Sequence, residues 1–223
     1  PDGLRKVFSA PLKGRCLVVG AGKAAASMAV ALEQYAKDNW PEAKLEGMVI
    51  TRYGHGLPTK AIQVVEAGHP VPDEAGLNGA KETLRLIKTL QPGDQLIALI
   101  SGGGSSLLTL PAADLSIQDL QITTQALLMS GAPIGQMNIV RKHLSAILGG
   151  HMAREAAGRG AKVDAFLISD VTGDHPSSIA SGPCAPDEST FADALQILKD
   201  YDLLQGQIPK AVSYTHLRAT RRS

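Results

Sequence analysis

Between residues 95 and 106 the chain reads Gln95-Leu96-Ile97-Ala98-Leu99-Ile100-Ser101-Gly102-Gly103-Gly104-Ser105-Ser106. The part before Ser101 is an apolar run of strand length, which predicts a strand buried on both faces of a parallel sheet. The three glycines permit backbone conformations that other residues avoid, and they let a ligand approach the main chain closely. In α/β proteins such loops bind anions at the carboxyl ends of the strands. We therefore expect an anion-binding loop at 101–106, with a flexible Gly/Ser linker as the alternative.

The rest of the chain repeats this strand-to-loop pattern. Short apolar runs predict four further strands, at residues 15–19, 47–51, 62–66 and 165–169. Helices are expected between and after them, at residues 24–35, 73–90, 116–129, 140–148, 150–157 and 190–199. Asp73 is predicted to cap the second of these helices, and Ser116 with Asp119 to form a capping box on the third. Strands that alternate with helices indicate βαβ units, and hence an α/β fold with a mostly parallel sheet.

The composition is that of an ordinary globular protein and argues against several other classes of protein. A length of 223 residues is enough to bury a full core. The formal net charge of +1 gives no basic field for nucleic acid or an anionic membrane. No apolar run approaches the roughly 20 residues that span a bilayer. The two cysteines make neither a disulfide framework nor a metal-binding spacing, so we expect a cytoplasmic protein.

The second glycine-rich loop, Gly20-Ala21-Gly22-Lys23-Ala24-Ala25, follows the first predicted strand. Its spacing matches the G-x-G-x-x-A form of the dinucleotide fingerprint, which requires an acidic residue at the end of the second strand. Thr51-Arg52-Tyr53 stands there instead, so NAD is weakly supported and NADP stays open through Arg52. The P-loop pattern fails as well, because Ala24 rather than Ser or Thr follows Lys23. What remains is a lysine at a helix N-terminus, a setting that favours anions, and we assign Lys23 a ligand-facing role.

Two carboxylates, Asp170 and Asp174, come just after the last predicted strand. Hard oxygen ligands beside a phosphate-binding loop suit Mg²⁺, which takes one or two carboxylates and keeps most of its waters. An Asx turn served by Gly173 is an equally good interpretation. From the residues alone the chain is an α/β enzyme for a phosphorylated or otherwise anionic small ligand, working with Mg²⁺.

Two other polar features carry less weight. The run Arg141-Lys142-His143 adds positive charge near a predicted helix start, and by itself such a run is more often a solvated face than a phosphate clamp. His69 is rigidly placed between Gly68 and Pro70. A lone loop histidine is usually structural, so no base is assigned there.

Six motifs taken together resemble one family, the class II glycerate 2-kinases, whose members are often labelled hydroxypyruvate reductases. The motifs are VVGAGKAA at 18–25, AGHPVPDEAG at 67–76, SGGGSSLL at 101–108, NIVRKHLS at 138–145, SDVTGD at 169–174 and IASGP at 179–183. The resemblance runs from about residue 14 to residue 209, and the joint match is highly specific.

The resemblance implies a Rossmann-like N-terminal domain over residues 1–210, with helices on both faces of the sheet. Such enzymes use ATP and Mg²⁺ to phosphorylate the 2-hydroxyl of D-glycerate, giving 2-phosphoglycerate. The family's essential lysine corresponds to Lys23, which would neutralise charge on the transferring phosphoryl group or on the substrate carboxylate. Asp170 and Asp174 are implied as catalytic carboxylates and metal ligands. Substrate and phosphate contacts are implied for Gly20, Gly22, Ser101, Gly102, Gly103, Gly104, Ser105, Ser106, Arg141, Lys142 and His143.

The chain also departs from the family. Leu148 stands where the family usually has a lysine, and the C-terminal domain that closes the cleft is missing. We therefore expect a fragment, whose activity alone is an open question. Residues 211–223 fit no part of the family and are expected to be a disordered or artefactual tail.

Two other functions are weighed against a kinase. One is an NAD(P)-dependent hydroxypyruvate reductase, against which the missing ribose-binding acid counts. The other is a non-catalytic sugar-phosphate-binding module. The expected partner is a small molecule rather than nucleic acid or a membrane, and a homodimer is left open.

Overall fold

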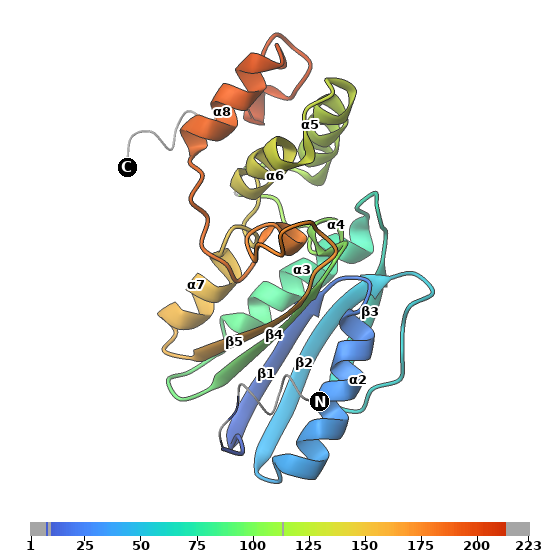
Figure 1. Ribbon diagram of the computed structural model, residues 1–223, viewed down its shortest axis with the longest axis vertical. Helices are drawn as coiled ribbons and strands as arrows, with labels where there is room; N and C mark the ends of the chain where they lie inside the picture. The colour runs from blue at the N-terminus through green and yellow to red at the C-terminus, as the bar shows by residue number, and fades with distance from the viewer. Residues whose placement is uncertain (1–7, 9, 113, 213–223) are drawn as a thin grey trace.

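The computed structural model describes residues 8, 10–112 and 114–212, and five strands form one sheet in that part of the chain (Figure 1). They are β1 (Gly14–Ala21), β2 (Ala43–Arg52), β3 (Ile62–Ala67), β4 (Gln95–Ser101) and β5 (Lys162–Ile168). Their spatial order is β3-β2-β1-β4-β5, and every neighbouring pair is parallel. The five predicted strands and the α/β class are thus confirmed.

Strands β1 and β4 are buried on both faces because their side chains alternate between two apolar layers. Leu17 and Val19 of β1 point into one layer, and Cys16 and Val18 point into the other. Helices α3 (Glu74–Ile87) and α7 (His151–Gly158) pack on the first face, and α2 (Ala25–Asn39) packs on the second. Helices on both faces of the sheet are therefore confirmed.

The remaining helices, α5 (Ile117–Met129), α6 (Ile134–His143) and α8 (Phe191–Asp200), pack mainly on one another. Their shared cluster includes the fully buried Leu127, Val140 and Leu198. In Figure 1 these three helices lie beyond the carboxyl ends of the strands, at the top of the view. We call them the helical unit. Between this unit and the sheet lie the short helix α4 (Gly104–Leu107) and the 3₁₀ turn η1 (Ile179–Ser181).

Two capping predictions are confirmed. The Asp73 side chain accepts a hydrogen bond from the Gly76 N–H (3.0 Å), and Ser116 with Asp119 forms the capping box of α5. Of the expected tail, Val212 is buried in the cluster of the helical unit, whereas residues 213–223 lie outside the described residues. No helix in the described part of the chain is long and apolar enough to cross a membrane.

The helix expected at 140–148 is wrong in its bounds, because α6 begins at Ile134 and ends at His143. It begins directly after Pro133, the N-cap residue, whose φ of −59° and ψ of 146° are not helical. It ends early because residues 144–146 pair with residues 110–112. The Ala112 N–H donates to the Leu144 carbonyl, and the Ala146 N–H donates to the Leu110 carbonyl (both 2.9 Å). The run 141–143 is therefore the last turn of a helix rather than the first.

Candidate active site

The carboxyl ends of the strands bring the polar candidates together. Lys23 follows β1, His69 follows β3, the glycine loop follows β4, and Asp170 follows β5. Helices α2 and α3 leave the sheet on opposite faces, so the loops after β1 and β4 meet where the strand order reverses. Ligands of open α/β sheets bind at such a switch point.

The two glycine-rich loops are joined by their main chains. The Lys23 N–H donates to the Gly102 carbonyl oxygen (2.9 Å), and the Ala24 N–H donates to Ser101 Oγ (3.0 Å). These bonds fix the start of α2 against the end of β4. The Lys23 side chain itself is exposed and has no hydrogen-bond or ion-pair partner among the described residues. Its charge is therefore available to a ligand.

The glycines at 102 and 103 make room for two functional side chains. A Cβ atom at Gly102 would collide with the Asp170 carboxylate. One at Gly103 would lie 2.7 Å from His69 Nε2 and 3.3 Å from Lys23 Cε. Gly103 also has a φ of 83°, which glycine adopts without steric cost. The loop thus gathers Lys23, His69 and Asp170 around its backbone.

A cavity of about 880 Å³ lies between this loop and the helical unit. His69, Ser105, Ser106 and Asp170 line it on the sheet side, and leucine and isoleucine side chains of α5 form much of the opposite wall. Arg141 of α6 lines it as well. A small anion entering the cavity would meet polar groups on one side and apolar side chains on the other.

Arg141 is a half-buried cation. Its guanidinium has no hydrogen-bond or ion-pair partner among the described residues. Burial lowers the pKa of Arg141, but an arginine stays protonated in proteins. An uncompensated buried charge is costly, so the position favours an anionic ligand.

Ser105 and Ser106 of the loop form hydrogen bonds within the protein. Ser105 Oγ lies 2.9 Å from Ser181 Oγ, and Ser106 Oγ donates to the Gly103 carbonyl oxygen (3.1 Å). Ser181 and the preceding Ala180 both have positive φ values, 57° and 51°. Such conformations cost of order 1–3 kcal/mol each and cluster at functional sites. To contact a ligand as predicted, the Ser105 and Ser106 hydroxyls would need a second hydrogen bond beside the one they form within the protein.

Other predicted residues lie away from the cavity. Lys142 Nζ pairs with Asp187 Oδ1 at 2.6 Å, with both side chains about nine-tenths buried. The His143 ring packs against Phe191, and its Nε2 lies 3.3 Å from Ser189 Oγ. Neither Lys142 nor His143 lines the cavity.

Seven further candidates are also not among its lining residues: Gly20, Gly22, Lys23, Ser101, Gly102, Gly104 and Asp174. Gly20 belongs to β1, where a Cβ atom would collide with the Leu99 carbonyl of β4. Gly22 similarly makes room for Ser101. Asp174 is exposed and is not among the lining residues of the cavity. Packing between strands therefore accounts for Gly20 and Gly22 without a ligand.

No cluster of three or more His, Cys, Asp or Glu side chains that could hold a metal ion occurs in the described part of the chain. Mg²⁺ does not need one, because it is often held by one or two carboxylates, waters and substrate phosphates. Asp170 is the carboxylate at the cavity that fits this pattern. Asp170 could hold such a cation together with waters and oxygen atoms of a ligand.

His69 was not assigned from the sequence, yet it lines the cavity. Burial lowers the pKa of His69, and the nearby charges of Lys23 and Arg52 lower it further, so the ring is neutral near pH 7. The sequence signal that could have found it is its place two residues after a parallel strand, where ligand-binding loops begin.

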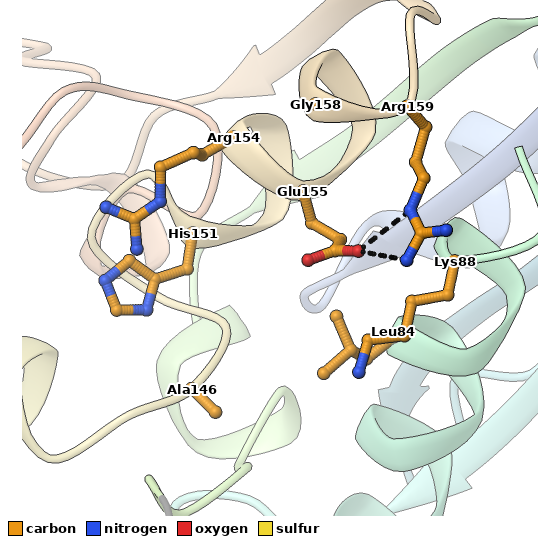
Figure 2. A pocket seen from close by; sticks show the side chains of 8 residues that line it. All are labelled: Leu84, Lys88, Ala146, His151, Arg154, Glu155, Gly158 and Arg159. Carbon is orange, nitrogen blue, oxygen red and sulfur yellow. Dashed lines mark hydrogen bonds and ion pairs between the residues drawn. The ribbon is translucent and has the colours of Figure 1, made fainter. Parts of the chain in front are cut away.

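A second cavity, of about 490 Å³, lies between α3 and α7 (Figure 2). Lys88, Arg154 and Arg159 line it, and Arg159 donates to Glu155 through Nε (3.2 Å) and a terminal nitrogen (3.1 Å). In Figure 2 the Arg154 guanidinium lies beside the His151 ring. None of the predicted site residues lines this cavity.

Comparison with known proteins finds a matching family and several relatives. The family described as "Domain of unknown function (DUF4147)" matches residues 3–217. A putative hydroxypyruvate reductase of Agrobacterium vitis is 50% identical over 90% of this chain and 44% of its own length. A glycerate 2-kinase of Pyrococcus horikoshii is 43% identical over 90% of this chain and 43% of its own length.

The crystal structure of a glycerate kinase from Thermotoga maritima superposes with a TM-score of 0.84 at 40% identity. That match covers 97% of this chain and 50% of the other. The chain thus spans about half the length of the relatives it matches, or less. By family match, sequence identity and fold, it belongs to the class II glycerate kinase family, in the part that forms the N-terminal domain.

Proposed function

We propose that this chain is the N-terminal part of an enzyme that transfers the γ-phosphoryl group of ATP to the 2-hydroxyl of D-glycerate. One observation carries the proposal. Arg141 lines the cavity from the helical unit, and Lys23 Cε borders Gly103, which lines it from the sheet side. Neither side chain has a hydrogen-bond or ion-pair partner among the described residues. D-Glycerate and ATP are both anionic, and electrostatic stabilisation is the main task in phosphoryl transfer.

Each group has a role that follows from its place. Lys23, beside the loop after β4, neutralises charge that develops on the transferring phosphoryl group. Arg141 suits the carboxylate of D-glycerate, because its planar fork of N–H groups matches two carboxylate oxygens. Asp170 provides a carboxylate for Mg²⁺, which would neutralise phosphate charge when bound. Asp174 stays a predicted carboxylate of the site, without contact to the cavity.

The reductase alternative has one observation on its side, the name of the Agrobacterium vitis relative. The geometry gives it less support. The second strand ends in Arg52 rather than an acid, and the Arg52 Nε donates to His55 Nε2 (2.7 Å). A cytoplasmic location and a homodimer stay predictions.

The test is ADP release with D-glycerate and MgATP, measured on this chain alone and on this chain joined to the C-terminal part of the Pyrococcus horikoshii relative. We expect D-glycerate-dependent ADP release from the joined protein. Oxidation of NADH with hydroxypyruvate, without ATP consumption, would establish the reductase instead. Binding of sugar phosphates without either reaction would indicate a binding module.

A further inference from the structure

We infer that His69 is a further catalytic residue of this site, whose Nε2 accepts the proton of the substrate hydroxyl during phosphoryl transfer. The inference rests on the proposed function, because it needs a hydroxyl that attacks a phosphoryl group.

The position of the ring is the first support. His69 lines the cavity from the loop after β3. That turn is tight, since a Cβ atom at Gly68 would lie 2.6 Å from the Val71 carbonyl oxygen. His69 Nε2 and Lys23 Cε approach the same point above Gly103. A phosphoryl group held by Lys23 would therefore lie next to the imidazole, where an attacking hydroxyl must also come.

The state of the ring is the second support. Burial lowers the pKa of His69, Lys23 and Arg52 lower it further, and Asp170 opposes them. A neutral ring carries its proton on one nitrogen and accepts through the other, and the inference needs Nε2 as the acceptor. Nε2 is the nitrogen that borders Gly103.

Asp170 is the other group that could accept the proton. Its carboxylate, however, approaches the neighbouring Gly102 and suits the metal-bound nucleotide. A base works best when its pKa lies near the working pH, which favours an imidazole over a carboxylate.

The step balances as follows. The O–H bond of the 2-hydroxyl breaks, and its proton goes to His69 Nε2. The hydroxyl oxygen forms a bond to the γ-phosphorus. The bond from that phosphorus to the bridging oxygen breaks, and ADP leaves with the electron pair. The imidazolium then returns its proton to water.

The test compares His69→Gln with His55→Gln in the joined protein. Glutamine can accept a hydrogen bond from the hydroxyl but cannot take its proton. We expect His69→Gln to lower kcat by about 10²-fold or more, with little change in KM for D-glycerate. His55, whose ring faces Arg52 outside the cavity, is the matched control and should leave kcat near the wild-type value.

The pH profile separates a base from a structural residue. In the wild type, kcat should fall as pH drops through the lowered pKa of His69, because protonation removes the acceptor. This decrease of kcat at acidic pH should persist in His55→Gln and be absent in His69→Gln. The same decrease and an unchanged kcat in His69→Gln would overturn the inference while the kinase assignment stands. Without ADP release from the wild type, the proposed function and this inference both fail.

A readout independent of the variant guards against misfolding. Nitrogen-15 shifts of the His69 ring in the wild-type protein report which nitrogen carries the proton. We expect the Nδ1–H tautomer, with and without D-glycerate. An Nε2–H tautomer would overturn the inference.

Discussion

Gly102 and Gly103 are needed for their neighbours as much as for a ligand. Asp170 occupies the space where one side chain would begin, and His69 and Lys23 border the other. A triple-glycine loop predicts close approach of something to the backbone. The structure shows that protein side chains approach it first. The loop therefore sets the distances between a cation, an imidazole and a carboxylate.

This gives a prediction for Gly103→Ala, with Gly131→Ala as its control. Both glycines have similar left-handed conformations, φ 83° and 75°, but Gly131 has open space where a Cβ atom would stand. Gly131→Ala should cost about 1–2 kcal/mol of unfolding free energy in urea, because alanine is strained there. Gly103→Ala should cost at least as much, because its Cβ atom also meets the His69 ring. Only Gly103→Ala should also move the His69 ring resonances and lower kcat in the joined protein. Equal effects of the two on kcat would contradict the assigned role of the loop.

Lys23 is tested by Lys23→Ala in the joined protein. We expect kcat/KM to fall about 10²-fold or more, because a charge contact to the transition state is lost. The control is Lys37→Ala, in the last turn of α2, the helix that begins just after Lys23. Initial rates of ADP release measure both. Near-normal turnover in Lys23→Ala would remove this lysine from the proposed mechanism.

At this scale the sequence predicted Lys23 and Asp170 at the site because both directly follow strands. The sequence could not show which residue of the run 141–143 faces a ligand. Successive helical residues point about 100° apart, so the three side chains cannot all face the same side. Arg141 faces the cavity, while Lys142 turns to Asp187. His69 was missed because its partners come from other loops, and a lone histidine carries no periodicity.

At the scale of elements, the Lys142–Asp187 pair ties the end of α6 to the segment that leads into α8. Asp187 also accepts a hydrogen bond from Ser189 Oγ (2.7 Å). Removing one partner leaves a buried charge, so Lys142→Met should lower the unfolding free energy by about 3 kcal/mol. Glu82→Gln breaks a largely exposed pair with Arg85 and should cost less than about 1 kcal/mol. Urea unfolding at pH 7 compares the two, and equal losses would contradict a structural role for the buried pair.

The same pair predicts an acid dependence of stability. Burial acts to raise the pKa of Asp187, but hydrogen bonds from Lys142 and Ser189 outweigh it and hold the pKa below its usual value. Its contribution is therefore complete above the unfolded-state pKa and is lost as pH falls through the lowered folded-state pKa. Asp187→Asn should flatten the unfolding free energy over this acidic range. A curve parallel to the wild type would show that other carboxylates account for the loss.

Element prediction succeeded where the signal is local and failed where it is not. The strands were found because each is a short apolar run, and α5 because Ser116 and Asp119 cap it. The end of α6 depends on pairing between residues 144–146 and 110–112. No local sequence pattern in either segment predicts this pairing.

At the scale of the whole molecule, helical periodicity shows that a helix has an apolar face but not what covers it. Helices α2, α3 and α7 pack their apolar faces against the sheet, whereas α5, α6 and α8 pack theirs mainly against one another. The sequence predicted the sheet and its two covering layers. It could not predict that a separate helical unit supplies the far wall of the cavity, with the half-buried Arg141 in it.

A ligand that contacts both walls should therefore stabilise both parts together. D-Glycerate at about 100 times its Kd should raise the unfolding free energy by about 2.7 kcal/mol. The single tryptophan, Trp40, lies against the sheet and reports on that part by fluorescence, while far-ultraviolet circular dichroism reports on all the helices. Both transitions should shift equally with D-glycerate in this chain, and Arg141→Ala should abolish both shifts. Arg154→Ala, which removes a cation from the second cavity, should leave them intact. A shift in only one probe would mean that the ligand does not connect the helical unit to the sheet.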